Sequence, residues 1–322
     1  MKPGKILAAD IGGTNSRFGH FETEPDGSLR LVRSQWFRTG DASSFGRLME
    51  ILRESAFSLL PQDADVAVMA VAGPVEQGAY SAPPLIPWDV DVSDMQTRHG
   101  CGRTVLINDF IAQAYACRSP VGKAAREILA GSVYPGAAAA VIGAGTGLGK
   151  AALIADRNGS FIAVPSEGGH AAFPFVSGPE FRFMDFLRQE HGMEYATGND
   201  IVSGKGLGLI HQFLSGEKLD PRDIAARFTS GSETLVWAAR FYGRVCRDFA
   251  LEVFARGGLY IAGGIAAKAP ELVTNEAFAS EFRDSKTMGR ILAQMPVFLI
   301  TNEESGLWGA ARYGQQLLKK GG

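Results

Sequence analysis

Cysteine is scarce in this sequence, and the three cysteines form no recognisable pattern. Cys101, Cys117 and Cys246 lie far apart, with no C-x-x-C pair and no Cys/His spacing typical of a metal site. This distribution excludes a disulfide framework and a zinc centre. We therefore expect reduced thiols in a cytoplasmic protein.

An excess of one charge and long hydrophobic runs are missing as well. The 32 basic and 34 acidic residues give a formal net charge of −2 and form no basic tract, so nucleic acid is not an expected partner. No window reaches the roughly 18 apolar residues of a membrane span, and the apolar run near the start is too short for a signal peptide. With 46% hydrophobic residues over 322 positions, the composition predicts a globular chain of one large domain or two.

Short apolar runs alternate with helical patterns along the chain, which predicts a mixed α/β architecture. In the first half the predicted strands are 6–9, 17–22, 29–38, 66–71 and 104–107, and the predicted helices are 45–60 and 110–118. In the second half the predicted strands are 139–142, 151–156, 160–164, 258–262 and 296–301, and the predicted helices are 177–191, 206–214, 221–228, 232–256 and 306–319. Ser177 and Glu180 have the spacing of a capping box at the start of one of these helices.

Both halves begin with a strand, a Gly/Thr turn and a hairpin, and this repetition indicates a duplicated layout. We expect two lobes with a central cleft. The predicted small lobe consists of residues 1–109 and about 302–322, and the predicted large lobe of residues 110–301.

Two glycine-rich turns follow predicted buried strands, at residues 10–15 and 143–149. The second, GAGTGLG, is not a P-loop, because Ala144 occupies the first glycine position and Ala151 follows Lys150. It is not a dinucleotide fingerprint either, because Leu148 occupies the last glycine position of that motif. Each turn is either an ordinary tight turn or a nest of backbone N–H groups that binds phosphate.

Taken as a pair, one in each half, the turns could hold the phosphates of a nucleotide from both sides. Asp10 could hold Mg²⁺ through water, because this hard cation prefers carboxylate oxygen. The candidate phosphate-binding residues are Asp10, Gly12, Gly13, Thr14, Asn15, Gly143, Gly145, Thr146 and Gly147.

Asn108 and Asp109 follow a predicted strand and open a predicted helix. A carboxylate in this position commonly caps the helix. In phosphoryl transfer, Asp109 could instead be the general base that takes a hydroxyl proton, with Asn108 orienting the same hydroxyl. Position alone leaves both interpretations open.

Two further turns carry candidate binding groups. Glu167 and His170 flank two glycines; this segment is either a solvated surface turn or a site for sugar hydroxyls, since a carboxylate can accept two hydrogen bonds. Gly263 and Gly264 close another apolar run and would let a flat adenine or ribose lie against the backbone.

In this order, the motifs of the chain resemble those of the bacterial glucokinase family, within the actin-like hexokinase/Hsp70 ATPase superfamily. The matching stretches are DIGGTNSR (10–17), VAGPV (71–75), INDF (107–110), GAGTGLG (143–149), PSEGGH (165–170), VSGKGL (202–207), YIAGGI (260–265) and GLWGAA (306–311). The zinc-binding cysteine cluster of the related ROK sugar kinases is absent, and no DNA-binding extension precedes Asp10, so a ROK-type repressor is not expected.

The resemblance implies a two-lobed actin-like ATPase (ribonuclease H-like) fold that binds ATP, Mg²⁺ and a hexose, usually as a homodimer. It implies that Asp109 is the base for the sugar 6-hydroxyl and that Asn108, Glu167 and His170 bind the sugar. The phosphates of ATP would lie at residues 12–14 and 145–147, and adenosine beside Gly263 and Gly264.

The chain departs from the family pattern at two places. Asn199 stands where the family usually has a glutamate that completes the sugar site, and residues 84–88 keep only Trp88 of a Thr-Asn-x-x-Trp stretch. The resemblance implies glucose as the substrate, and because both departures border the sugar pocket, mannose, fructose or an amino sugar stay open as alternatives. A non-catalytic sugar sensor of the same fold, and ADP or polyphosphate as the phosphoryl donor, also stay open.

Overall fold

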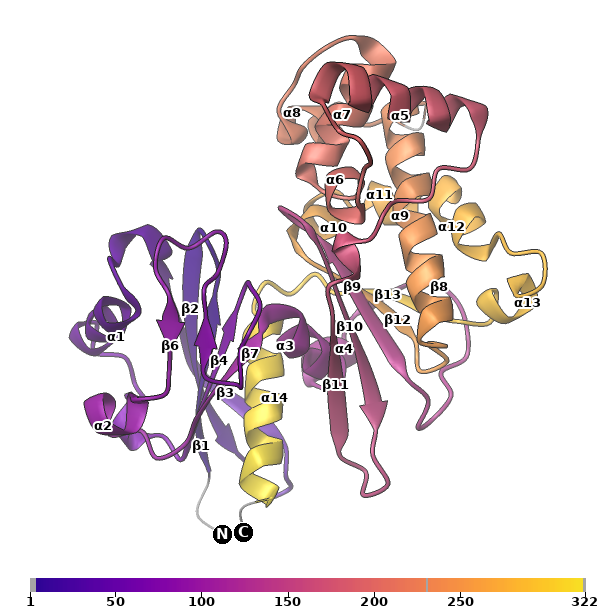
Figure 1. The fold of residues 1–322 in the computed structure, drawn as a ribbon. Coiled ribbons are helices and arrows are strands. Elements are labelled where there is room, and N and C mark those ends of the chain that lie inside the picture. Colours follow the sequence, from indigo (N-terminus) through magenta and orange to yellow (C-terminus); the bar gives the residue numbers. More distant parts are fainter. Residues whose placement is uncertain (1–3, 230, 321–322) are drawn as a thin grey trace. The chain divides into compact units, whose positions relative to one another are not determined.

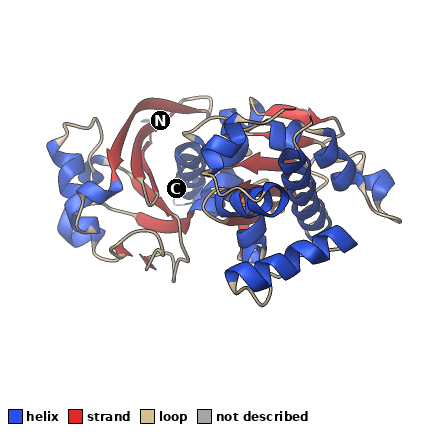
Figure 2. Ribbon diagram, turned by 90° about the horizontal axis from the view of Figure 1, so that it is seen from above, coloured by secondary structure: helices blue, strands red, loops and turns tan. Residues whose placement is uncertain are grey.

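A computed structural model describes residues 4–229 and 231–320 of the chain. Its contacts divide the chain into two compact units: unit 1 contains the residues up to Ala124 and those from Asn302 onward, and unit 2 is Ala125–Thr301 (Figure 1). Each unit combines a sheet with helices (Figure 2). Among the described residues, no helix has both the length and the apolar character that crossing a membrane requires.

Unit 1 is built on a five-stranded sheet in the order β3-β2-β1-β4-β7. Its strands are β1 (Lys5–Ile11), β2 (Asn15–Thr23), β3 (Leu29–Arg38), β4 (Val66–Val71) and β7 (Thr104–Asn108), with a small hairpin of β5 (Tyr80–Ser81) and β6 (Val90–Asp91). Its helices are α1 (Phe45–Glu54), α2 (Met95–His99), α3 (Asp109–Ala116), α4 (Pro120–Lys123) and α14 (Ser305–Lys320).

Unit 2 contains a six-stranded sheet in the order β11-β10-β9-β12-β13-β8. Its strands are β8 (Arg126–Leu129), β9 (Ala139–Ala144), β10 (Leu148–Ala155), β11 (Phe161–Ser166), β12 (Leu259–Ala262) and β13 (Val297–Leu299). Its helices are α5 (Gly178–His191), α6 (Gly198–Ile201), α7 (Gly204–Ser215), α8 (Pro221–Ala226), α9 (Glu233–Glu252), α10 (Gly264–Lys268), α11 (Glu271–Thr274), α12 (Glu276–Arg283) and α13 (Gly289–Leu292).

The two sheets repeat one topology, as the duplicated layout predicted. In each, an antiparallel meander of three strands (β1–β3 or β9–β11) is followed by parallel strands beside its first strand (β4 and β7, or β12 and β13). The central strands read as continuous apolar runs because both faces of the sheet are buried. In β1, for example, Leu7 contributes to one core cluster and Ile6 to another on the opposite face.

The chain leaves unit 1 after Ala124, which is later than the boundary at Asp109 that the sequence predicted. The helix α3 belongs to unit 1 because it packs closely against α14. A side chain at Gly309 of α14 would lie 1.7 Å from the carbonyl oxygen of Ala112 in α3, so glycine allows the two backbones to approach this closely. The sequence near α3 could not predict this packing, because α14 lies far away along the chain.

The predicted capping box at Ser177 is wrong. The Ser177 side chain makes no capping hydrogen bond, although α5 does begin at Gly178. The carboxylate of Glu180 instead accepts a hydrogen bond from the Val176 backbone N–H at 2.8 Å and is fully buried. It is drawn away from the cap by arginines of α9.

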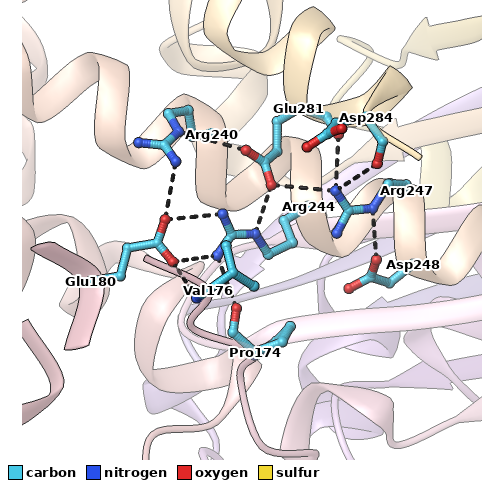
Figure 3. A network of polar contacts seen from close by, with 9 residues as sticks. All are labelled: Pro174, Val176, Glu180, Arg240, Arg244, Arg247, Asp248, Glu281 and Asp284. Carbon is cyan, nitrogen blue, oxygen red and sulfur yellow. Dashed lines mark hydrogen bonds and ion pairs between the residues drawn. The ribbon is translucent and has the colours of Figure 1, made fainter. Parts of the chain in front are cut away.

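These arginines form a buried ionic network that joins α5, α9 and α12 (Figure 3). The Arg244 guanidinium is fully buried and lies 2.7 Å from both Glu180 and Glu281. Arg240 and Arg247 extend the network at its two sides. Burial alone would raise the pKa of Glu180, but the hydrogen bonds from Arg244 hold it below its ordinary value.

The predicted helix at 45–60 ends earlier than expected, at Glu54. Ser44 caps its start by accepting a hydrogen bond from the Arg47 N–H at 3.1 Å. Shortly after the helix end, Ala56 has φ of 53°, a left-handed conformation that stops the helix. Alanine is not typical of helix ends, so the sequence could not predict that the helix ends here.

Candidate functional site

In unit 1 the candidate residues lie at one edge of the sheet. The parallel strands β1, β4 and β7 end together, with Ile11 aligned to Val71 and Val71 to Asn108. The loop of residues 12–15 and the Asn108–Asp109 pair therefore both leave the sheet at its carboxyl edge, where open α/β sheets bind ligands.

Asp10 lies near the end of β1 and forms an ion pair with Arg17. The two residues are opposite each other in the β1–β2 register, and Asp10 Oδ2 lies 3.0 Å from Arg17 Nη1. The guanidinium of Arg17 is held over the ring of Trp36, 4.1 Å from its centroid. Burial raises the pKa of Asp10 above its ordinary value even though Arg17 opposes this shift.

The start of α14 also approaches Asp10. A Cβ at Gly306 would lie 2.7 Å from Asp10 Oδ2, so glycine at this position leaves room for the carboxylate. Among the described residues, no three His, Cys, Asp or Glu side chains gather around a metal position. A single carboxylate fits Mg²⁺, which commonly keeps several waters and completes its shell with substrate phosphates.

The loop of residues 12–15 is fixed by hydrogen bonds at its base and is exposed at its tip. The Gly12 N–H donates to the Asn15 carbonyl at 3.0 Å, and Thr39 donates its hydroxyl to the Gly12 carbonyl at 2.6 Å. A Cβ at Gly13 would lie 2.9 Å from the carbonyl of Leu85, so the proline-rich stretch packs directly on the loop. Gly13 and Thr14 are exposed, which leaves the tip accessible to a ligand.

Asn108, rather than Asp109, is the N-cap of α3. Its Oδ1 accepts the Phe110 N–H at 2.8 Å, and its Nδ2 donates to the Gly73 carbonyl at 3.0 Å. Asp109 is the first residue of the helix and is half-buried. The helix start is thus secured by Asn108, and the capping interpretation does not require Asp109.

In unit 2 the second glycine turn connects β9 to β10. The Gly145 N–H donates to the Gly147 carbonyl at 2.8 Å, and the Gly145 carbonyl accepts from Gly204 at the start of α7 at 3.1 Å. The Leu148 N–H donates to Asn199 Oδ1 at 2.7 Å. Thr146, at the tip, is exposed. This turn is therefore fixed at its base and open at its tip, like the turn in unit 1.

The Gly263–Gly264 turn lies beside the β9–β10 turn. Parallel pairing aligns Ala262 of β12 with Gly143 of β9. Gly263 has φ of 91° and ψ of 158°, and a Cβ on it would lie 2.9 Å from the Ala144 carbonyl. A small pocket opens nearby; among the residues that line it are Ala144, Ser203, Leu207, Tyr242, Ile265 and Leu272.

Glu167 and His170 face solvent from a short 3-10 turn after β11. Glu167 Oε2 lies 3.8 Å from His170 Nε2, and the two side chains are 69% and 73% exposed. Both are therefore accessible to a ligand.

Asn199 lies between this turn and the glycine turn. A Cβ at Gly169 would lie 2.6 Å from Asn199 Oδ1, and one at Gly147 would lie 3.0 Å from the same atom. Its oxygen already holds the Leu148 N–H, so Asn199 positions both turns whatever else it binds.

Sequence reasoning missed several residues that support these turns. Arg17 and Gly306 belong to quoted motifs, DIGGTNSR and GLWGAA, but their contacts with Asp10 follow only from the fold. Tyr242, whose hydroxyl accepts the Ala144 N–H at 3.1 Å, lies within an amphipathic helix and has no distinguishing pattern. Trp88 is the one residue of 84–88 that agrees with the family pattern. It lies in the core and donates its indole N–H to the Ala42 carbonyl.

A family model described as glucokinase matches residues 7–317. Two curated proteins that are similar to this chain are glucokinases. The glucokinase of Nostoc punctiforme is 30% identical over 95% of this chain and 97% of its own length. That of Sinorhizobium medicae is 32% identical over 97% of this chain and 93% of its own length.

Solved structures agree in fold. The crystal structure of a glucokinase from an Antarctic psychrotroph has a TM-score of 0.82 at 27% identity, covering 96% of this chain and 98% of that one. A ROK family glucokinase from Streptomyces griseus, solved with glucose and AMPPNP, has a TM-score of 0.61 at 20% identity, covering 97% of this chain and 100% of that one. The fold is that of the two-lobed actin-like ATPases.

Proposed function

The chain belongs to the glucokinase family, and from this membership we infer that it transfers the γ-phosphoryl group of ATP to the 6-hydroxyl of glucose. The observation that carries the inference is the match to glucokinases along almost the whole chain. The enzyme is accordingly a hexokinase-type phosphotransferase that uses an alcohol as acceptor. The roles of its residues are proposed below.

Asp109 is proposed as the general base. In phosphoryl transfer the nucleophilic hydroxyl must lose its proton as it attacks phosphorus, and a carboxylate within hydrogen-bond reach can accept that proton. The half-buried position of Asp109 at the sheet edge, on a helix start that Asn108 secures, supports this role. Asn108 keeps one amide hydrogen and one lone pair for the sugar after its two backbone bonds.

Glu167 and His170 are proposed to bind the remaining sugar hydroxyls, since both are accessible and polar. Asn199 would contribute to the same site through its amide NH₂ group, while its Oδ1 accepts the hydrogen bond from the Leu148 N–H. An amide forms weaker hydrogen bonds than the carboxylate usual at this position, because charge-assisted bonds are roughly twice as strong.

The two glycine turns are proposed to bind the phosphates of ATP through the backbone at residues 12–15 and 143–147, with adenosine beside Gly263 and Gly264. Asp10 would contact hydrated Mg²⁺, which when bound offsets the negative charge on the phosphates. The exposed tips of both turns support the assignment of the phosphates, and the carboxylate of Asp10 near the end of β1 supports the proposed contact with hydrated Mg²⁺.

Alanine substitutions at Gly263 and Gly264 separate a structural role from nucleotide binding. Gly263→Ala is expected to lower the free energy of unfolding by about 2 kcal/mol, because its backbone conformation is essentially limited to glycine. A Cβ added at Gly264 would have no atom within 4 Å, so Gly264→Ala should leave thermal stability nearly unchanged. It should nevertheless raise the KM for ATP if adenosine lies against it. An unchanged KM for ATP in Gly264→Ala argues against the adenosine assignment.

A panel of hexoses tests the proposed function. ADP release should depend on glucose and ATP, with weaker activity on mannose, fructose and amino sugars and none with polyphosphate in place of ATP. Preference for another hexose would support the second candidate, a kinase for that sugar, which the altered position Asn199 favours. Hexose binding without any turnover would identify a sensor.

We propose further that the enzyme acts in the cytoplasm as a homodimer, without nucleic acid or membrane partners. The three cysteines are free and buried, which suits a reducing compartment. The small net charge gives no reason to expect a polyanionic partner.

A further inference from the structure

The hydroxyl of a buried tyrosine holds the backbone at the start of the second glycine turn. Tyr242 lies in α9 and is only 2% exposed. Its hydroxyl oxygen accepts the Ala144 N–H at 3.1 Å, although the two residues are 98 positions apart in the sequence. Nothing in the proposed chemistry uses this hydroxyl.

The Ala144 N–H needs this partner because the neighbouring strand ends too early to pair with it. The Ala140 N–H donates to the Gly258 carbonyl, just before β12, at 3.0 Å, and the N–H four residues later in β9 points to the same side. The pairing of β9 with β12 ends, however, at Gly143 and Ala262. Ala144 is buried, so without the hydroxyl its N–H would lack both a partner and water.

Ala144 also connects the two turns that we propose bind ATP. It belongs to the turn at residues 143–147, and a Cβ on Gly263 would lie 2.9 Å from its carbonyl oxygen. The turn proposed for adenosine therefore packs against the same residue whose N–H the hydroxyl holds. Tyr242, Ala144 and Ile265 line one small pocket. A shift of Ala144 would therefore disturb both turns together.

We propose that Tyr242 is a positioning residue for ATP binding, an inference that rests on the proposed function. Its hydroxyl fixes Ala144 through one hydrogen bond, and Ala144 sets the spacing between the phosphate turn and the adenosine turn. The hydroxyl acts through the backbone and not on the nucleotide or the sugar. Its loss should therefore weaken ATP binding and leave glucose binding nearly unchanged.

The test removes this hydroxyl with Tyr242→Phe, which keeps the ring and its packing. The Kd for the ATP analogue AMPPNP with Mg²⁺, measured by calorimetry without sugar, should rise about fivefold, the effect of one ordinary hydrogen bond. The KM for ATP should rise by a similar factor. The kcat and the Kd for glucose should stay within about twofold of wild type, so the loss appears in nucleotide binding alone.

Phe278→Leu is the matched control for a general loosening of the core. Phe278 of α12 is fully buried and packs edge-to-face on the Tyr242 ring, with 6.2 Å between the centroids. Leucine leaves the hydroxyl in place but should lower Tm, because it fills the core less well. The Kd for AMPPNP should nevertheless stay within about twofold of wild type. Positioning by the hydroxyl thus weakens nucleotide binding only in Tyr242→Phe, whereas a looser core would weaken it in both variants.

Three results would overturn the inference. Unchanged AMPPNP affinity in Tyr242→Phe would leave its hydroxyl with a purely structural role. Equal weakening in Tyr242→Phe and Phe278→Leu, or an equal loss of glucose affinity in Tyr242→Phe, would show a general effect on the fold. If the wild-type chain does not bind AMPPNP, the proposed function fails and this inference fails with it; a wild type that phosphorylates glucose, with an unaffected Tyr242→Phe, overturns the inference alone.

Discussion

Asp109→Asn should lower kcat for glucose phosphorylation by about a thousandfold, the loss typical of a missing general base. Asparagine keeps the size of the side chain and can still accept a hydrogen bond from the Phe110 N–H, as Asp109 Oδ1 does at 3.0 Å. It cannot accept the proton of the attacking hydroxyl. The Kd for glucose should therefore change by less than about threefold, so the loss appears in kcat rather than in binding.

The control for this substitution is Asp63→Asn, an exposed residue of the same unit, which should retain full activity. Tm should stay within about 2 °C of wild type in both variants, because Asn108 caps the helix independently. A turnover of Asp109→Asn within tenfold of wild type would contradict the assignment and leave Asp109 with a structural role at the start of α3.

Arg244→Ala should destabilise unit 2 by about 3–5 kcal/mol, because it removes the fully buried cation between Glu180 and Glu281 and leaves the buried carboxylate of Glu180 only the ion pair with the partly exposed Arg240. Unfolding can be followed by fluorescence of Trp237, the one tryptophan in the sequence of unit 2. Arg188→Ala is the matched control, since Arg188 pairs with Asp185 on the exposed side of α5. It should cost less than about 1 kcal/mol. Equal losses in the two variants would show that the network adds nothing beyond a surface ion pair.

Because of the same network, the stability of unit 2 should depend on pH in the acid range. Because the pKa of Glu180 is lower in the folded chain than its ordinary value of 4.5, its contribution to stability is complete above that value. The contribution is lost as the pH falls through the lower, folded-state pKa. Arg244→Ala should therefore lose less stability than wild type between neutral pH and this acid range.

Much of the fold follows from local patterns. The apolar runs at β1, β4 and β9 are buried on both faces, and Gly263, after β12, stands where its turn meets the backbone of Ala144. These features depend on residues close in sequence. The repeated strand order followed from the repeated layout for the same reason.

The errors share a cause, which is contact with residues distant in sequence. Glu180 leaves its predicted cap because Arg244, 64 residues away, binds it. The contact of the Asn199 oxygen with the Leu148 N–H was missed because only the folded chain brings the two residues together, while the place of Asn199 in the sugar site stays a prediction. Similarly, α3 joins unit 1 because Gly309 of α14 lets it pack there.

The most direct test of the account is transfer of label from γ-labelled ATP to glucose and to 6-deoxyglucose, which lacks the proposed acceptor hydroxyl. We expect labelled glucose 6-phosphate with glucose and no labelled sugar with 6-deoxyglucose, although 6-deoxyglucose should compete for binding. Labelled 6-deoxyglucose, or glucose that binds without receiving label, would contradict phosphorylation at the 6-hydroxyl.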